Sequence, residues 1–339
     1  MIFLPFDALP RDEKLRMQLL HEYFAGQYVS STLINDVWSI DLHFPDSHEH
    51  YIDPRLMEGL LWWESSLKVS EIPFAVRRDR GFQLYLNDSW TLFTWSQWLS
   101  TYVNQIGLPP EIVVLHIDDH DDLMSPKIWN KNRGWIDAIT GNTINIIEPD
   151  SIHNAISSGA IGIGNFIVPL LHSIQRVQIR HLCATSHNVV MKGHYSLSPI
   201  LVADTLLNPI NKRIAIKREA CQNFSSEIET KSTYTITAEL NEWLQDLPAN
   251  VPVLLHIDMD YFNDRYNGDS DWELHPYCYD PSQEQIIRSI DLIFDTLRQK
   301  RVMDKICSVD VALSPGFFPA EFWEPSIDRI RYHLSNRSN

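Results

Sequence analysis

The chain contains several short runs of apolar residues, each ending in polar or turn-forming residues. Runs of this length that are apolar on both faces are typical of strands buried inside a sheet. Most of the expected strands are of this kind, at 112–118, 177–183, 213–218, 252–258 and 305–311. Weaker strand patterns occur at 37–43 and within 72–86.

Other segments place apolar residues three and four positions apart, which is the period of an amphipathic helix. The clearest is 283–299, where Ile286, Ile290, Ile293 and Leu297 share one face. Helices are also expected at 11–26, 53–67, 90–106 and 237–244, together with a final helix near the C-terminus. Three segments without a clear period are predicted as loops, at 123–149, 220–235 and 263–281.

Strands and helices therefore alternate along most of the chain. This order favours an α/β fold with one mainly parallel sheet covered by helices on both faces, a three-layer sandwich. No obvious linker divides the chain, so we expect a single domain spanning 1–339, in which 1–70 form an N-terminal extension of unknown role.

Two of the predicted strands end in metal-binding types of residue. One apolar run leads through His116-Ile117 into Asp118-Asp119-His120-Asp121-Asp122, and another leads through His256-Ile257 into Asp258-Met259-Asp260. Residues two apart on a strand point to the same side, so Asp118, His120 and Asp122 are expected to converge. Several carboxylates held together repel one another unless protons or a cation compensate their charge.

The ligand set favours two cations. Five ligands are more than one tetrahedral zinc ion binds. A ligand set of mostly oxygen atoms with one nitrogen is typical of manganese or another first-row ion. A single aspartate-rich turn is more often a helix cap or a solvated loop, but its repetition after two strands favours a metal site. His116 and His256 lie inside the apolar runs, where a hydrogen-bonded core histidine is the expected role.

Composition narrows the function. The 339 residues include 28 lysines and arginines against 44 aspartates and glutamates, a net charge of −16 that argues against nucleic-acid binding and suits a cationic substrate. The four cysteines have no metal-finger or redox-pair spacing, which is typical of a reducing compartment. No apolar run reaches about 18 residues and no signal peptide is recognisable, so we expect a cytoplasmic protein without a membrane span.

The two motifs resemble those of a known fold. Asp118-Asp119-His120-Asp121-Asp122 and Asp258-Met259-Asp260 are similar to the Asp-x-His-x-Asp and Asp-x-Asp motifs of the arginase/deacetylase fold. With the Asn165-Phe166-Ile167 segment and the run from Ser314 to Pro319, they resemble the peptide arginases over roughly 75–330. That family converts arginine to ornithine and urea within ribosomally made precursor peptides.

The resemblance implies roles for individual residues. Asp118 and Asp258 would bridge two manganese ions, Asp122 would complete one ion's shell, and His120 with Asp260 would complete the other's. A hydroxide between the ions, oriented by Asp122, would attack the guanidinium carbon of an arginine in a precursor peptide. The oligomeric state stays open.

Several positions depart from the family pattern. A metal-binding histidine of ordinary arginases is replaced near Asn87-Asp88-Ser89, where Asp88 is either an oxygen ligand or a helix cap. Leu313 stands at the position of the substrate-binding glutamate, for which the candidates are Glu321, Glu324 and Asp310. The catalytic histidine has the candidates His153, His187 and His194.

Other functions remain open at this point. One zinc held by Asp118, His120 and Asp258 would suit a deacetylase-like amidohydrolase, and free small guanidino compounds are alternative substrates. A metallophosphoesterase is disfavoured because neither cluster has a neighbouring basic residue for phosphate. A non-catalytic protein that keeps a metal for stability is a further alternative.

Overall fold

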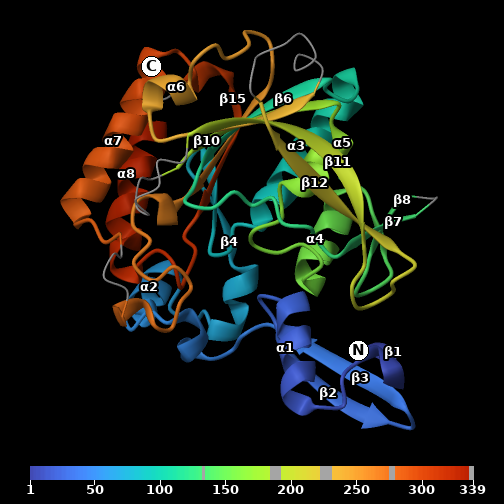
Figure 1. Cartoon of the computed structure of the whole chain (residues 1–339). Coiled ribbons are helices and arrows are strands. Elements are labelled where there is room, and N and C mark those ends of the chain that lie inside the picture. Colours follow the sequence, from blue (N-terminus) through green and yellow to red (C-terminus); the bar gives the residue numbers. More distant parts are fainter. Residues whose placement is uncertain (132–133, 184–191, 222–230, 275–278, 336–339) are drawn as a thin grey trace.

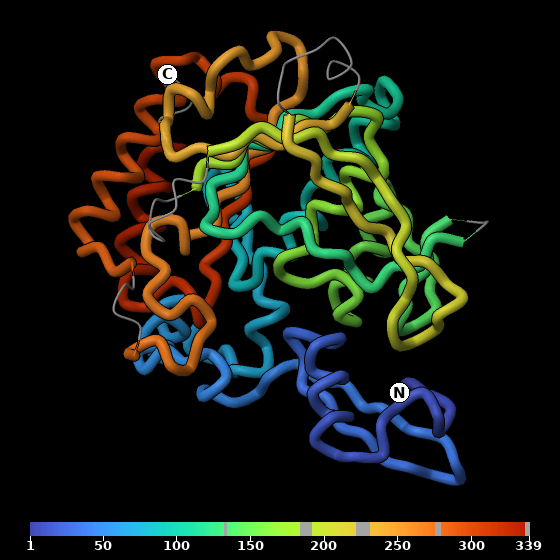
Figure 2. Tube along the Cα trace, viewed as in Figure 1, coloured from blue at the N-terminus to red at the C-terminus, as the bar shows by residue number. Residues whose placement is uncertain are grey.

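The computed structural model of the chain describes residues 1–131, 134–183, 192–221, 231–274 and 279–335. A large α/β body and a small N-terminal sheet form two parts of the molecule, and the same arrangement is visible along the Cα trace (Figures 1 and 2). The strands are β1 (Ile2–Pro5), β2 (Tyr28–Ile34), β3 (Val37–His43), β4 (Val76–Asp79), β5 (Phe82–Tyr85), β6 (Glu111–Ile117), β7 (Ile128–Lys131), β8 (Gly134–Asp137), β9 (Thr143–Ile144), β10 (Arg176–Leu182), β11 (Gly193–Ala203), β12 (Lys212–Ala220), β13 (Ser232–Thr237), β14 (Val253–Asp258) and β15 (Ile306–Ala312).

The body is organised around a 12-stranded mixed sheet of order β4-β5-β15-β14-β6-β10-β13-β11-β12-β7-β8-β9. Its central strands, from β5 to β13 in this order, run parallel to one another. Antiparallel strands extend the sheet on both sides. The predicted parallel sheet is thus confirmed for the core, whereas the whole sheet is mixed.

Helices cover both faces of the parallel core, as Figure 1 shows for α7 and α8 on one side and α3, α4 and α5 on the other. Alternation along β6 supplies both interfaces: Val113 and Leu115 pack in one buried cluster with α2, α7 and α8, and Ile112 and Val114 pack in another with α3, α4 and α5. The helices are α1 (Glu13–Tyr23), α2 (Leu56–Trp63), α3 (Trp90–Ile106), α4 (Pro149–Ser158), α5 (Val168–Ser173), α6 (Leu240–Trp243), α7 (Gln283–Gln299) and α8 (Trp323–Ser335).

The helices with the strongest sequence signals begin and end where they were predicted. In α7, Gln285 Oε1 accepts a 2.8 Å hydrogen bond from Ser282 N and so caps the first turn, while the face of Ile286, Ile290 and Ile293 is buried. No helix among the described residues has both the length and the apolar character needed to cross a membrane.

The sheet extends beyond what the sequence pattern predicts. The expected loop at 123–149 contains the short strands β7, β8 and β9, and two further strands, β11 and β13, were not predicted. β13 pairs parallel with β10 at the edge of the parallel core, whereas β7, β8, β9 and β11 lie outside that core, and β11 alternates partly buried and exposed positions. A strand with one face in solvent lacks the continuous apolar run that marks a core strand, which is why the pattern failed there.

The first 43 residues form a unit of their own, which we call the N-terminal module. Its antiparallel sheet has the order β1-β3-β2, and α1 packs on it around Leu20, Phe24 and Ile40. The end of α1 is joined to the body by a 2.9 Å hydrogen bond from the Tyr23 hydroxyl to Asp204 Oδ2, and Gln27 Nε2 donates to the Ser158 carbonyl at 3.2 Å. These buried contacts fix the module against the body near α4.

Candidate metal centre

Strands β6 and β14 are parallel neighbours in the middle of the sheet, and they bring the two acidic motifs together. Their register pairs His116 with His256 and Ile117 with Ile257, so Asp118 and Asp258 follow at the same level. The motif carboxylates therefore gather at the carboxyl ends of adjacent strands, where α/β proteins commonly bind ligands.

The convergence of the first motif comes from a turn. β6 ends at Ile117, and Asp122 adopts a left-handed backbone with φ of 52°, so the chain curls back over the strand end. Non-glycine residues seldom adopt this conformation, and it recurs at functional sites. The expectation that one continued strand aligns Asp118, His120 and Asp122 is therefore corrected: a loop brings them together.

One candidate ligand group consists of Asp118, His120 and Asp260, whose ligand atoms all lie within 4.8 Å of one another. His120 Nδ1 lies 3.0 Å from Asp260 Oδ2 and 3.6 Å from Asp118 Oδ1. Backbone amides hold the carboxylates in place, since His120 N donates to Asp118 Oδ1 and Asp119 N donates to Asp260 Oδ1.

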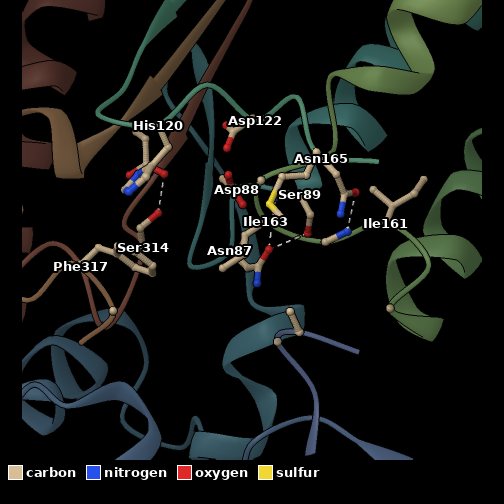
Figure 3. Close-up of a pocket in the computed structure, with 18 of the residues that line it drawn as sticks. Asn87, Asp88, Ser89, His120, Asp122, Ile161, Ile163, Asn165, Ser314 and Phe317 are labelled. Carbon is tan, nitrogen blue, oxygen red and sulfur yellow. Dashed lines mark hydrogen bonds between the residues drawn. The ribbon is translucent and has the colours of Figure 1, made fainter. Parts of the chain in front are cut away.

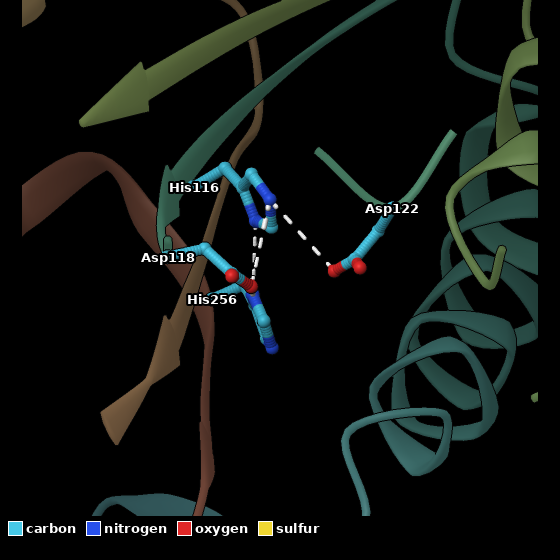
Figure 4. Close-up of side chains that lie close together, drawn as sticks. All are labelled: His116, Asp118, Asp122 and His256. Carbon is cyan, nitrogen blue, oxygen red and sulfur yellow. Dashed lines mark hydrogen bonds and ion pairs between the residues drawn. The ribbon is translucent and has the colours of Figure 1, made fainter. Parts of the chain in front are cut away.

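A second group consists of His116, Asp118, Asp122 and His256, all buried and again with ligand atoms within 4.8 Å (Figure 4). Here His116 Nε2 lies 3.6 Å from Asp118 Oδ2 and 3.8 Å from Asp122 Oδ2. Asp118 belongs to both groups and offers one oxygen to each, which is the arrangement a bridging carboxylate requires.

The two fully buried histidines support the cluster through hydrogen bonds. His116 Nε2 lies 3.0 Å from the carbonyl oxygen of His120, and His116 Nδ1 lies 3.0 Å from His256 Nδ1. A carbonyl only accepts, so we assign the His116 proton to Nε2, and His256 Nδ1–H then donates to His116 Nδ1. Both His116 nitrogens are thereby used, so His116 supports the second group rather than binding an ion itself, in keeping with the expected core role.

Asp258 and Asp88 complete the acidic cluster. Ser314 Oγ donates a 2.5 Å hydrogen bond to Asp258 Oδ2 from the loop after β15. Asp88 follows β5 and is 3 % exposed, and Figure 3 shows it next to Asp122. Its Oδ1 has no hydrogen-bond partner among the described residues. The charges of Asp122, Asp258 and Asp260 act on Asp88, so it lies beside the predicted ligands.

The charges of the cluster are not balanced by the protein. Burial and the neighbouring carboxylates raise the pKa of Asp88, Asp118 and Asp258 well above the usual value, and burial raises that of Asp122 to about 7. Burial alone would lower the pKa of His120, but Asp260 and Asp118 raise it well above its normal value. Such a site must hold either protons or cations.

The unpaired atoms show that the residues fit divalent cations. Asp88 Oδ1, Asp118 Oδ2 and Asp122 Oδ2 are buried and lack hydrogen-bond donors within the described part of the chain. An orphaned buried carboxylate oxygen is costly, and coordination to a cation removes that cost. The donor set is oxygen-rich with imidazole nitrogen, as hard or borderline first-row ions prefer.

The cluster opens into a cleft of about 940 Å³. Its walls include Asn165 and the loop of Ser314 and Phe317, which Figure 3 shows around the site. The opposite end is lined by Tyr23 and Gln27 of the N-terminal module. The extension of unknown role therefore forms one wall of the candidate site.

The predicted substrate-binding acids lie elsewhere. Glu321 Oε1 accepts a 2.7 Å bond from Arg265 Nη1, and Glu324 is exposed on α8; neither lines the cleft. Asp310 is fully buried in the middle of β15, where Tyr85 and Trp95 donate to it.

The histidine candidates are likewise not gathered at the cluster. His153 is exposed on α4 and packs against Trp90 and Phe93, and His194 lies on β11 beside Thr235. His187 lies outside the described residues. Among the described residues, the histidines in the two ligand groups are His116 on β6, His256 on β14 and His120 in the loop after β6.

One contributor, His181, was missed by sequence reasoning. His181 on β10 pairs in register with His116 on β6, which pairs with His256 on β14, so three adjacent strands carry a histidine at one level. The Nε2 atom of His181 lies 2.9 Å from the Asp118 carbonyl oxygen, and its Nδ1 atom lies 2.5 Å from the Tyr234 hydroxyl. Asp264 follows the second motif in the chain, and its buried Oδ2 has no hydrogen-bond partner among the described residues. Burial and the charge of Asp260 raise its pKa to about 8. The signal for His181 was its place near the end of a predicted strand.

Comparison with known proteins assigns no family. No protein-family model matches the chain, and no curated protein sequence matches it. What the geometry establishes is an α/β protein with a large mixed sheet and a buried histidine/aspartate cluster that is able to hold metal.

Proposed function

We propose that the chain is a metal-dependent hydrolase that converts peptidyl arginine to peptidyl ornithine and urea. The observation that carries the proposal is the shared carboxylate of Asp118, which offers one oxygen to each of two ligand groups at the base of a cleft. Two manganese ions are the cofactors that this donor set and the motif resemblance favour.

The number of acids favours two ions over one. A single zinc held by Asp118, His120 and Asp258, as in a deacetylase-like site, leaves Asp88 and Asp122 buried with unpaired oxygens. Each orphaned oxygen would then need a proton, and the site would retain several raised pKa values. Two cations engage the same oxygens without protonation.

The substrate is expected to be cationic and extended. The acidic cluster attracts a guanidinium group electrostatically, and a carboxylate offers it two parallel hydrogen bonds. A cleft of about 940 Å³ is at the upper end of the usual range for small-ligand pockets, and its length from the cluster to the N-terminal module suits a peptide better than a free amino acid.

The reaction adds one water. The water oxygen forms a bond to the guanidinium carbon, and the bond from that carbon to Nε breaks. Both water protons pass to Nε, which leaves as the ornithine ammonium group while neutral urea is released. When bound, the cations would lower the pKa of water towards neutrality and polarise the substrate. Asp122 would orient the attacking water beside the ions, and His120 with Asp118 would fix the geometry around it.

The test uses manganese-loaded protein and a synthetic arginine peptide with blocked ends. The peptide mass is expected to fall by that of CH2N2, with one urea released per arginine. Peptides carrying acetyl-lysine, and free arginine or agmatine, serve as comparison substrates. Unchanged arginine peptides together with deacetylated lysine peptides would overturn the proposal in favour of an amidohydrolase.

A further inference from the structure

The cleft contains a second polar region, formed by Lys127 just before β7 and Arg213 on β12. Both line the cleft at the end that the N-terminal module closes. Lys127 is only 7 % exposed, which is unusual for a lysine without an ion-pair partner. The chain has a net charge of −16, so two positively charged side chains on one wall of the cleft stand out from its overall charge.

Strand geometry places these two side chains on one face. β12 pairs antiparallel with β7, with Arg213 opposite Trp129 and Lys212 opposite Asn130. Side chains alternate along a strand, so Lys127 and Trp129 point to the side of Arg213, and Lys212 points to the other. The face with Arg213 is turned towards the N-terminal module, because the Cζ atom of Arg213 lies 5.2 Å from the centre of the Tyr23 ring.

Neither cation is neutralised by an ion pair within the described residues. Lys127 Nζ makes one 3.3 Å hydrogen bond, to the Gly159 carbonyl, and Arg213 Nε is buried without a partner. Burial and the charge of Arg213 lower the pKa of Lys127 to about 8. The two groups therefore repel each other and retain unused donors.

The nearby acids are engaged by other donors. Asp137 accepts from the Ile139 and Thr140 amides and from Ser158 Oγ. Asp204 accepts from the Tyr23 hydroxyl and the Trp129 indole as well as from two backbone amides. Neither acid accepts a hydrogen bond from Lys127 or Arg213 among the contacts of the described residues, although the charge of Asp137 raises the pKa of Lys127 against the effect of burial.

We propose that Lys127 and Arg213 form a subsite for a carboxylate of the substrate. Two cationic donors with unused hydrogens on one wall of a closed cleft match a carboxylate, which accepts on both oxygens. This inference rests on the proposed function for the identity of the substrate, but the subsite itself needs no metal chemistry.

The subsite is within reach of the acidic cluster along a peptide. Asp122, Met124, Ser125 and Lys127 all line the cleft, so the chain runs along it from one region to the other. Five residues span at most roughly 18 Å when extended. A carboxylate within about five residues of the target arginine therefore reaches the subsite, either on an acidic side chain or at the C-terminus of the peptide.

The test measures binding by calorimetry to the full chain loaded with manganese. Three peptides share one arginine: a neutral peptide with both ends blocked, the same peptide with a free C-terminal carboxylate, and a blocked peptide in which a glutamate lies near the arginine. At least one acidic peptide is expected to bind about tenfold more tightly than the neutral one. The tighter of the two identifies the source of the carboxylate.

The variants then locate the preference. Arg213→Gln is expected to abolish the preference for acidic peptides, and Arg213→Lys to keep part of that preference. The matched control Lys212→Gln removes one positive charge from the other face of β12 and should keep the full preference. Lys127→Met provides a second test if Arg213→Gln does not fold. Equal affinities for all three peptides in the unaltered protein, or a folded Arg213→Gln protein with the full preference, would overturn the subsite.

A urea assay on the neutral peptide separates this inference from the proposed function. Absence of urea with an intact carboxylate preference rejects the hydrolase and leaves the subsite standing. Urea release without any carboxylate preference rejects the subsite alone.

Discussion

His116 and His256 lie at the same level of neighbouring strands, with their Nδ1 atoms 3.0 Å apart beneath the acidic cluster. Only one proton fits between two nitrogens at this distance, so one ring donates and the other accepts, and we assign both rings as neutral. Burial keeps them so, because it lowers the pKa of His256 to about 3 and that of His116 well below its usual value.

His256→Ala removes this donor and leaves His116 Nδ1 without a partner in the core. We expect the free energy of unfolding to fall by about 2–4 kcal/mol, from the lost hydrogen bond and the cavity. Metal affinity should fall by about 10- to 100-fold, because a group that holds the ligand loop is disturbed. Urea unfolding and competition with a chelating dye measure the two effects, and His21→Ala on the exposed face of α1 is the control. Unchanged metal affinity in a folded His256→Ala protein would remove the pair from the site.

Asp118→Asn is expected to separate stability from metal binding. It removes one charge from the repelling cluster, so the metal-free protein should become more stable at pH 8. The stabilisation that manganese confers, about 2.7 kcal/mol at 100 times the dissociation constant, should disappear. Thermal unfolding with manganese or with EDTA measures both. Asp121→Asn is a matched control, since Asp121 pairs with Arg218 at 2.9 Å outside the two ligand groups. Full manganese stabilisation of Asp118→Asn would refute the shared-ligand assignment.

Removal of metal should make stability depend strongly on pH. The folded protein raises the pKa of Asp122 to about 7 and that of Asp264 to about 8, from about 3.9 in the unfolded chain. Between these values the folded state keeps protons that the unfolded state has released, so stability falls as pH rises, by up to about 1.4 kcal/mol per pH unit for each group.

Urea unfolding in EDTA between about pH 4 and pH 8 checks this slope. With manganese the slope should be much smaller, because bound cations take the place of the protons. A metal-free protein whose stability rises over the same range would show that the cluster carboxylates are not the dominant titrating groups.

Glu321→Gln tests whether this residue binds substrate or holds the structure. Glu321 pairs with Arg265 in a partly buried contact, so the substitution should lower the free energy of unfolding by about 1–3 kcal/mol and leave KM for an arginine peptide unchanged. The exposed Glu324→Gln should change stability by less than about 0.5 kcal/mol. A tenfold rise in KM for Glu321→Gln at unchanged stability would instead identify the substrate carboxylate.

The parallel core and its ligand-bearing strand ends were predictable because burial on both faces leaves a continuous apolar run. The run before Asp118 and the run before Asp258 have this form, and they are neighbours in the sheet as the metal hypothesis required. The period of α7 was equally clear, since one face of it is entirely core.

The remaining features depend on contacts between distant segments. The partner of Asp258 is Ser314, which lies 56 residues away, and the curl at Asp122 follows from a local backbone conformation without a sequence signature. The outer strands alternate or are short, and the wall formed by Tyr23 belongs to a module that resembled nothing recognisable in the sequence. Such features become visible only when the register of the sheet is known.

The most direct test of the metal centre is the number of ions bound per chain. Protein loaded with manganese, dialysed and measured by inductively coupled plasma mass spectrometry should contain two manganese ions per chain, and fewer after Asp118→Asn. A folded, unaltered protein that retains no divalent metal after loading would contradict the account.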